Sequence, residues 1–334
     1  MPPSSRRIPL LVCCWMFCFF FASHHRPPTI RAFSTFAKRS TGRSTILSRG
    51  SIGATTRLYQ STVATTSVET AEAMSTTSKT TKKTMPPAVA ANKKEKMCSY
   101  PIEMTEAEKY LFDLNGYLIV RNVLTPDEVE EANSVIDRHE HEMVERTDKD
   151  LRNTQPGSSY AGNGITGRMD LGQCLEWPGR DSTIFKSILA HPRLVPIFHE
   201  LLGKGYRMDH LPLILAQEQY SEGFQLHGGT IDCTSGEYQP HLAYTYNHGM
   251  LRTALLGCNV ILRDHKAGDG GFCIVPGSHK ANFKMPPGMV EGNAYADYVR
   301  QPTTNAGDVI LFSEGTVHGA KVRGTRTVLS GELH

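Results

Sequence analysis

The chain has 334 residues, of which 39% are hydrophobic and 8% aromatic, enough apolar material for the core of one large domain with extensions. Its net charge of +3 is unevenly divided, since residues 1–96 carry 15 Lys and Arg against 3 Asp and Glu, whereas the remainder carries 21 basic and 30 acidic residues. An acidic folded part is not expected to bind nucleic acid, and the basic N-terminal segment is expected to have a separate role.

The N-terminal segment has the composition of a targeting sequence. Two arginines precede an apolar run over residues 8–22, which has the length of a signal-peptide core and is short for a membrane span. Residues 23–68 are rich in Ser, Thr and Arg and contain no acidic residue, as is typical of transit peptides. The combination resembles the bipartite presequences of algae with secondary plastids. We therefore expect residues 1–68 to direct the protein to a plastid, with the mitochondrion, the secretory pathway or an uncleaved membrane anchor as alternatives.

A linker, two helices and a strand are expected next. Residues 69–100 are rich in Thr, Lys and Ala, which favours disorder, so the folded domain is expected over residues 101–334. Thr105 begins a Thr-Glu-Ala-Glu capping box, and the Asn-Gly pair that follows the helix is a stop signal. Thr125 begins a second helix with Pro at its first position, and a buried strand is predicted between the two helices over residues 117–120.

The middle of the domain is expected to be less regular. Residues 147–180 are rich in Gly, Ser, Asn and Asp, which predicts a long loop of the kind that often covers a substrate. Arg168 and Asp170 in this loop can contribute to a site, although pairing at the surface is the simpler interpretation. His139 and His141 lie two residues apart on the second helix, so their side chains are expected to diverge into solvent rather than to bind a metal.

Short helices followed by many strands are expected in the C-terminal half. Two helices near residues 182–189 and 192–202 precede apolar, β-branched runs that are separated by Gly, Pro, Asn and Asp. The predicted strands cover residues 211–216, 220–226, 255–263, 272–275, 309–312 and 327–333. This order favours a mainly β fold with flanking helices, either an antiparallel barrel or a sandwich.

The eight cysteines predict neither a disulfide framework nor a zinc site. Three of them lie in the apolar run, and the rest form an odd-numbered set without CxxC spacing: Cys98, Cys174, Cys233, Cys258 and Cys273. We expect buried free thiols.

Two histidines and an arginine on the predicted strands suit an iron site that also binds a carboxylate. His227 follows the stretch over residues 220–226, and His318 follows the strand over residues 309–312 after a short loop. Imidazole is a common ligand of iron. Arg326 lies on the last predicted strand, where a guanidinium that faces the interior can form a bidentate pair with a carboxylate. Taken singly, each residue is also explained by packing or by a surface position.

The order and surroundings of these residues resemble the phytanoyl-CoA dioxygenase family of the non-haem Fe(II)/2-oxoglutarate oxygenases, over residues 105–334. The matching motifs are NGYLIV at 115–120, HP at 191–192, LHGG at 226–229, DGGFCIVPGSHK at 269–280, AGDVILF at 306–312 and HG at 318–319. The resemblance implies a double-stranded β-helix, which is a cupin-like jelly roll. It also implies that His227 and His318 bind Fe(II), and that Arg326 or Arg323 anchors the cosubstrate 2-oxoglutarate.

The carboxylate that the family carries two positions after the first histidine is missing, because that position is Gly229. Three interpretations stay open. Another group can complete the iron shell, either water or a carboxylate, with Asp232, Glu237 and Asp264 as candidates. A halide can fill the gap, as in the iron/2-oxoglutarate halogenases, because it restores the negative charge that the carboxylate supplies. In the third interpretation the site is inactive and the barrel only binds a ligand.

The resemblance implies an oxidoreductase that hydroxylates a small organic or lipid-like molecule with Fe(II) and 2-oxoglutarate. A halogenase and an inactive binding protein are the alternatives that Gly229 raises. The motif over residues 269–280 is structural in the family, so no ligand role is expected for His279. A small-molecule substrate is expected, with no nucleic-acid partner and no membrane partner for the mature domain. Family members usually continue beyond the strand that carries Arg326, so the sequence can be a piece of a longer chain.

Overall fold

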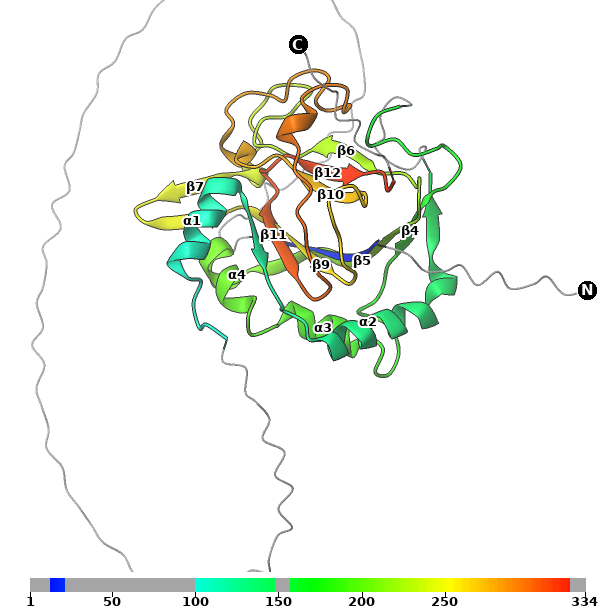
Figure 1. Cartoon of the computed structure of the whole chain (residues 1–334). Helices are drawn as coiled ribbons and strands as arrows, with labels where there is room; N and C mark the ends of the chain where they lie inside the picture. Colours follow the sequence, from blue (N-terminus) through cyan, green and yellow to red (C-terminus); the bar gives the residue numbers. More distant parts are fainter. Residues whose placement is uncertain (1–12, 22–99, 148–156, 325–334) are drawn as a thin grey trace, which may run out of the picture. The chain divides into compact units, whose positions relative to one another are not determined.

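The computed structural model describes residues 13–21, 100–147 and 157–324, and of residues 13–21 it describes the backbone alone. This part of the chain consists mainly of strands, with helices beside them (Figure 1). The α-helices are α1 (Glu106–Asn115), α2 (Pro126–Arg138), α3 (Thr183–Leu189) and α4 (Val195–Leu202). The strands are β1 (Cys13–Phe21), β2 (Tyr117–Val120), β3 (Val144–Arg146), β4 (Arg168–Leu171), β5 (Arg207–Gln217), β6 (Phe224–His227), β7 (Tyr244–Asn247), β8 (Met250–Thr253), β9 (Leu255–Ile261), β10 (Gly271–Ile274), β11 (Val309–Ser313) and β12 (His318–Lys321). Short 3-10 helices cover Glu140–Glu142, Pro240–Leu242, Ser278–Lys280 and Ala296–Tyr298.

The first two helices begin and end where the sequence signals predict. Thr105 caps α1 by accepting a hydrogen bond from the Glu108 N–H, and the Glu108 carboxylate accepts one from the Thr105 N–H at 2.9 Å. Gly116 follows the helix in the left-handed region, with a φ of 77°. Thr125 and Glu128 form the same capping box at the start of α2. Both helices are thus specified by local contacts, whereas the strand β2 between them pairs with the distant β11.

The strands form two facing antiparallel sheets and a hairpin. The larger sheet has the order β2-β11-β9-β1-β5-β4-β3, the smaller one has the order β10-β12-β6, and β7 pairs with β8. The smaller sheet lies over one face of the larger sheet, and α2 and α3 lie on its opposite side (Figure 1). This confirms a strand-rich fold with flanking helices.

The two layers of the core follow from the alternation of side chains along the strands. On β11, Val309 and Leu311 contact the cluster that contains the helices, whereas Ile310 and Phe312 contact a second cluster between the sheets. Successive strand residues point to opposite faces, so a strand covered on both faces is apolar throughout. On β5, Ile214 likewise contacts the cluster with the helices, whereas Leu213 and Leu215 contact the cluster between the sheets. The face of the large sheet that carries Leu213 and Leu215 is therefore the one that faces β6, β10 and β12.

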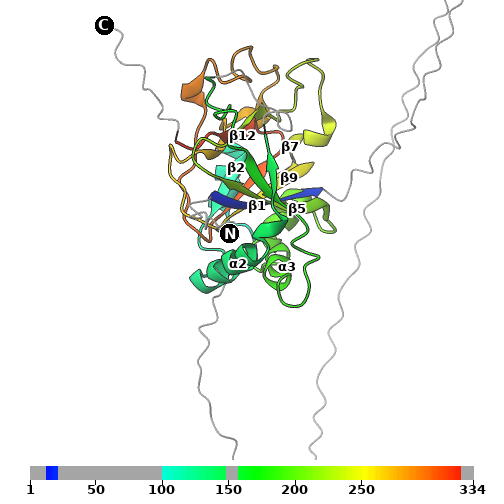
Figure 2. The ribbon, with the colours of Figure 1, turned by 90° about the vertical axis from the view of Figure 1, so that its right-hand side faces the viewer.

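The middle strand of the large sheet comes from the N-terminal apolar run. β1 pairs antiparallel with β5 on one side and with β9 on the other, with Cys13 opposite Gln217 and Phe21 opposite Leu255. Figure 2 shows β1 beside both strands, above α2 and α3. A stretch expected to be the removable core of a signal peptide therefore takes part in the folded sheet. Its removal and the plastid destination stay predictions, and residues 22–99, with the expected linker, lie outside the described residues.

The stretch predicted as a long loop contains a strand. β4 pairs with β3 on one side and with β5 on the other, and Met169 lies opposite Ala216. The prediction was wrong here because the segment around β4 is rich in turn-forming residues, whereas pairing with β5 depends on residues distant in the sequence. Residues 148–156 lie outside the described residues.

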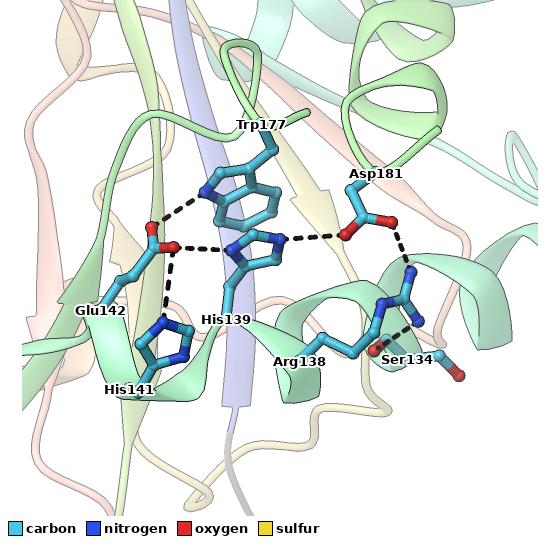
Figure 3. Close-up of polar contacts among 7 residues, drawn as sticks. All are labelled: Ser134, Arg138, His139, His141, Glu142, Trp177 and Asp181. Carbon is cyan, nitrogen blue, oxygen red and sulfur yellow. Dashed lines mark hydrogen bonds and ion pairs between the residues drawn. The ribbon is translucent and has the colours of Figure 1, made fainter. Parts of the chain in front are cut away.

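His139, at the end of α2, forms a hydrogen bond with Asp181 just before α3 (Figure 3). Its Nδ1 lies 2.8 Å from a Glu142 carboxylate oxygen, and its Nε2 lies 3.0 Å from one of Asp181. The Trp177 ring stacks on the imidazole at 4.0 Å, and its N–H donates to Glu142. The expected solvent-facing histidine pair is therefore wrong for His139, which is buried, and right for His141, which is exposed. Burial by itself would lower the pKa of His139, but the carboxylates at both ring nitrogens raise it above the ordinary value.

The described cysteines agree with the prediction of free thiols. Cys174, Cys258 and Cys273 are buried, Cys233 is partly buried, and none of these forms a disulfide. Burial raises the pKa of each of the three buried thiols to about 12, so they are inert at neutral pH. Within the described ranges, no helix has the length and hydropathy of a membrane span.

Candidate metal centre

The small sheet brings together the two histidines that the sequence predicts as metal ligands. His227 is the last residue of β6, His318 is the first residue of β12, and the two are direct partners in the antiparallel register. Their ring centroids lie 4.2 Å apart. Because directly opposite residues on paired strands have neighbouring Cβ atoms, strand pairing alone is enough to place both imidazoles at one point.

Backbone carbonyl groups set the tautomer of both rings. Nδ1 of His227 lies 3.0 Å from the Gln225 carbonyl oxygen, and Nδ1 of His318 lies 2.8 Å from the Thr316 carbonyl oxygen. A carbonyl oxygen only accepts, so Nδ1 donates in each ring and the lone pair of the neutral imidazole is on Nε2. Metal-binding histidines are usually held in this way.

A carboxyl group that the sequence analysis missed lies beside His318. Oε2 of Glu314 is 3.7 Å from Nε2 of His318, which is too long for a hydrogen bond. The Glu314 side chain is 9% exposed, and its Oε1 has no hydrogen-bond partner among the described residues. The sequence feature that could have pointed to Glu314 is its position as an acidic residue in a four-residue loop between two apolar strands.

Burial drives both members of this pair toward their neutral forms. It raises the pKa of Glu314 to about 8. Burial also lowers the pKa of His318 well below its ordinary 6.5, and the neighbouring His227 lowers it further. Although the two groups are close enough to be an ion pair, they are therefore both neutral near pH 7 in the absence of another charge.

The histidines line a pocket of about 210 Å³ between the small sheet and β5. Phe224, Phe272 and Leu215 supply much of its apolar wall. Arg168 is the one Lys or Arg among its lining residues in the described part of the chain, and its Nε and Nη2 donate to the Asp170 carboxylate at 2.7 and 2.8 Å. The expectation of a surface pair is therefore wrong, because Arg168 and Asp170 are only 8% and 7% exposed.

Gly229 does not continue the strand that carries His227. β6 ends at His227, and Gly228 and Gly229 both lie in the left-handed region, with φ of 79° and 90°. A Cβ atom at Gly229 would have the Val317 side chain and the Ile231 carbonyl as its nearest neighbours, at 3.5 and 3.6 Å. The expected alternation, in which a residue at this position shares the face of His227, therefore fails.

The three carboxylates proposed to replace Gly229 are exposed or held in a turn, whereas Glu314, which does not line the pocket either, approaches His318. Asp232 accepts hydrogen bonds from the N–H groups of Thr234 and Ser235, which lower its pKa and account for its role in a turn. Glu237 is exposed. Asp264 is exposed too, and it accepts a hydrogen bond from the Ala306 N–H.

The two arginines proposed as cosubstrate anchors differ in what the structure shows. Arg326 lies outside the described residues, and so does the strand predicted around it. Arg323 lines a different pocket, together with Asp264 and Asp269. His279, for which no ligand role is expected, is buried, and its Nε2 donates to the Asp113 carbonyl oxygen at 3.0 Å.

Within the described part of the chain, no group of three or more His, Cys, Asp or Glu side chains is already arranged around a metal position. The site nevertheless contains two imidazoles with their lone pairs on Nε2 and a buried carboxyl group with an unsatisfied oxygen. These groups fit a divalent cation, because it would supply the positive charge that the buried carboxylate lacks.

Comparison with known proteins agrees with the sequence motifs. The family model for phytanoyl-CoA dioxygenase (PhyH) matches residues 112–326, which is more than half of the chain. The chain belongs to the phytanoyl-CoA dioxygenase family. The family expected from the motifs is thereby confirmed, and with it membership of the Fe(II)/2-oxoglutarate-dependent oxygenases.

Individual relatives are distant. The ectoine dioxygenase of Stutzerimonas stutzeri (strain A1501) is 23% identical over 235 residues, which are 63% of this chain and 68% of that protein. HygX from Streptomyces hygroscopicus, with nickel and 2-oxoglutarate bound, is 22% identical with a TM-score of 0.49, over 66% of this chain and 82% of that one. EctD from S. alaskensis, with 2-oxoglutarate and 5-hydroxyectoine, is 20% identical with a TM-score of 0.42, over 66% and 71%. At these identities the relatives do not identify a substrate.

Proposed function

We propose that this chain is an Fe(II)- and 2-oxoglutarate-dependent oxygenase that hydroxylates a small organic or lipid-like molecule. The observation that carries the proposal is the pairing of His227 with His318 on adjacent strands, with Nε2 as the lone-pair nitrogen in both rings. Family membership supports the class of chemistry. The two facing antiparallel sheets support a double-stranded β-helix as the scaffold.

Fe(II), when bound with 2-oxoglutarate, supplies the activation of O2 that a C–H bond of the substrate requires. In the overall reaction 2-oxoglutarate loses CO2 and becomes succinate, which takes up one oxygen atom, and the other converts the C–H bond into C–OH. The protein holds the metal through His227 and His318. The aromatic wall formed by Phe224 and Phe272 limits the access of water to the pocket.

The cosubstrate needs polar partners in the interior. Arg326 is proposed as the anchor of its distal carboxylate, because an arginine on a strand can form a bidentate pair. Asn259 on β9 is a second polar group of the interior, since it is fully buried and neither atom of its amide has a hydrogen-bond partner among the described residues. Buried amides are rarely left unsatisfied, so a bound dicarboxylate is a fitting acceptor.

The proposal is tested by an anaerobic titration of the full chain with Fe(II) and 2-oxoglutarate, followed by the metal-to-ligand absorption band. His227→Ala and His318→Ala are each expected to abolish the band, because the metal loses one of two imidazole ligands. His279→Gln is the matched control, since His279 is buried like His318 but lies away from the pocket. Wild-type protein that gives no band and forms no succinate in air would leave the chain as an inactive binding protein.

A halogenase is the second candidate, and Gly229 is the observation that favours it. A halide bound to the iron would take the place of the absent carboxylate. Chloride is then expected to change the absorption band of the wild-type complex. Identical spectra with and without chloride would exclude this candidate.

A further inference from the structure

We propose that Glu314 is the third protein ligand of this metal and takes the place of the carboxylate that is missing at Gly229. The inference rests on the proposed function and deepens it. The site then has two histidines and one carboxylate, with the carboxylate supplied by the loop between β11 and β12. Glu314 lies four residues before His318, whereas the family pattern puts the carboxylate two residues after His227.

The distance between the donor atoms suits a shared ion. Oε2 of Glu314 lies 3.7 Å from Nε2 of His318. Two donor atoms that are each about 2.1 Å from one small divalent ion lie between about 3 Å and about 4.2 Å apart, depending on the angle between them. The separation is too long for a hydrogen bond and falls inside this range, so the two groups can bind the same cation with little movement.

Because the Glu314 carboxyl group is buried, its lack of a hydrogen-bond partner among the described residues points to a missing ligand. The Glu314 side chain is 9% exposed, and its Oε1 finds no donor within the described part of the chain. A buried carboxyl group with an unsatisfied oxygen is less stable than one whose oxygens are all hydrogen-bonded or bound to a cation. The imidazole beside it is also buried and has its lone pair on the atom nearest the carboxylate. A cation that displaces the proton of Glu314 would have two electron-pair donors here, a carboxylate oxygen of Glu314 and Nε2 of His318.

The loop that carries Glu314 is held rigidly. The Glu314 N–H donates to the Leu255 carbonyl oxygen at 3.1 Å, and the Thr316 N–H donates to that of Ser313 at 2.8 Å. The Val317 N–H donates to the Ser278 hydroxyl at 2.8 Å. These bonds attach the loop to β9 and to the Pro-Gly turn after β10. A ligand on such a loop is preorganised, as a metal site requires.

The same loop explains the glycine pair after His227. A Cβ atom at Gly228 would lie 2.8 Å from the carbonyl oxygens of both Glu314 and Thr316. The chain after His227 therefore passes directly against the loop, which only glycine allows. At Gly229 a Cβ atom would touch the Val317 side chain at 3.5 Å and the Ile231 carbonyl oxygen at 3.6 Å, which are ordinary contacts. Gly228 thus accommodates the Glu314 loop.

Charge also favours Glu314 over a halide. Fe(II) with two neutral imidazoles and a dianionic cosubstrate has no net charge, and either a carboxylate or a halide adds one negative charge. Because Glu314 already supplies this group from within the fold, no exogenous anion is needed.

The test measures the affinity of the full chain for Fe(II) alone, under anaerobic conditions, by competition with a fluorescent chelator. Glu314→Gln keeps the shape of the side chain and removes its charge, and we expect it to weaken Fe(II) binding at least about 10–100-fold. Asp232→Asn is the matched control, because it removes a carboxylate from the loop after β6 without touching the pocket, and it is expected to bind like wild type.

Rescue distinguishes a ligand from a packing residue. In Glu314→Ala, formate is expected to restore Fe(II) affinity by occupying the vacated volume, whereas wild type is expected not to respond. Chloride is expected to have no effect on wild type and to tighten binding in the Ala variant. This arm keeps the test decisive if the Gln variant does not fold.

The outcomes separate the two proposals. Equal Fe(II) affinity of wild type and Glu314→Gln would overturn the role of Glu314 and leave the proposed function intact. Tighter Fe(II) binding by wild type in chloride would also overturn it, in favour of the halide. Failure of wild type to bind Fe(II) at all, with or without 2-oxoglutarate, would instead overturn the proposed function.

Discussion

Deletion of residues 1–21 is expected to unfold the large sheet, because β1 lies in its middle. β1 pairs with β5 at eight positions and with β9 at seven. Antiparallel ladders with this many pairs contain roughly 15 backbone hydrogen bonds. At about 0.5–1.5 kcal/mol each, their loss amounts to roughly 8–20 kcal/mol. A domain is stable by only about 5–15 kcal/mol, so the truncated protein is not expected to fold.

The assay is urea-induced unfolding followed by circular dichroism. The control variant lacks residues 1–12 alone, which precede β1, and it is expected to unfold at the wild-type urea concentration with the wild-type slope. The variant without residues 1–21 is expected to show no cooperative transition. A transition at the wild-type midpoint would refute the reasoning that β1 is an integral strand.

Such a refuting result would agree with the predicted removal of residues 1–68. Another segment would then have to pair with β5 and β9. The described part of the chain comes close to the end of β5 at which Cys13 pairs with Gln217. Just beyond that end, the Tyr220 N–H donates to the Arg323 carbonyl oxygen. Deleting residues 325–334 from the truncated protein would test whether the strand predicted over residues 327–333 takes the position of β1.

Two further predictions concern stability. Burial lowers the pKa of His139, but its hydrogen bonds to Glu142 and Asp181 outweigh burial and raise the pKa above 6.5. The stabilisation from His139 is therefore complete below pH 6.5 and is lost as the pH rises through the raised pKa. In His139→Gln this alkaline loss is expected to be absent from melting temperatures between about pH 6 and about pH 9, and an equal loss in both proteins would contradict the assignment. Phe198→Ala removes a fully buried ring from α4 and is expected to cost about 3–5 kcal/mol in urea unfolding. The control Phe283→Ala, at a side chain that is 87% exposed, is expected to leave stability unchanged, and equal losses in the two variants would contradict this explanation.

Local signals in the sequence predicted the elements whose stability depends on near neighbours. The capping boxes at Thr105 and Thr125 involve residues three apart, so they could be recognised without the fold. The apolar runs that become β9, β10 and β11 are buried on both faces and therefore lack alternation, but their length and the turn-forming residues near their ends identify them. The family motifs predicted the His227 and His318 pair, because both residues lie at strand ends with a characteristic sequence around them.

Tertiary structure decided what depends on contacts between distant segments. The apolar run over residues 13–21 is compatible with a signal core or with a central strand, and its pairing with β5 and β9 can be seen only in the fold. The face of Gly229 could not be predicted from alternation, because two left-handed residues end the strand at His227. Glu314 has no local motif that marks it as a ligand. Its significance comes from burial and from a 3.7 Å approach to His318, and both arise only when the loop between β11 and β12 crosses from one sheet to the other.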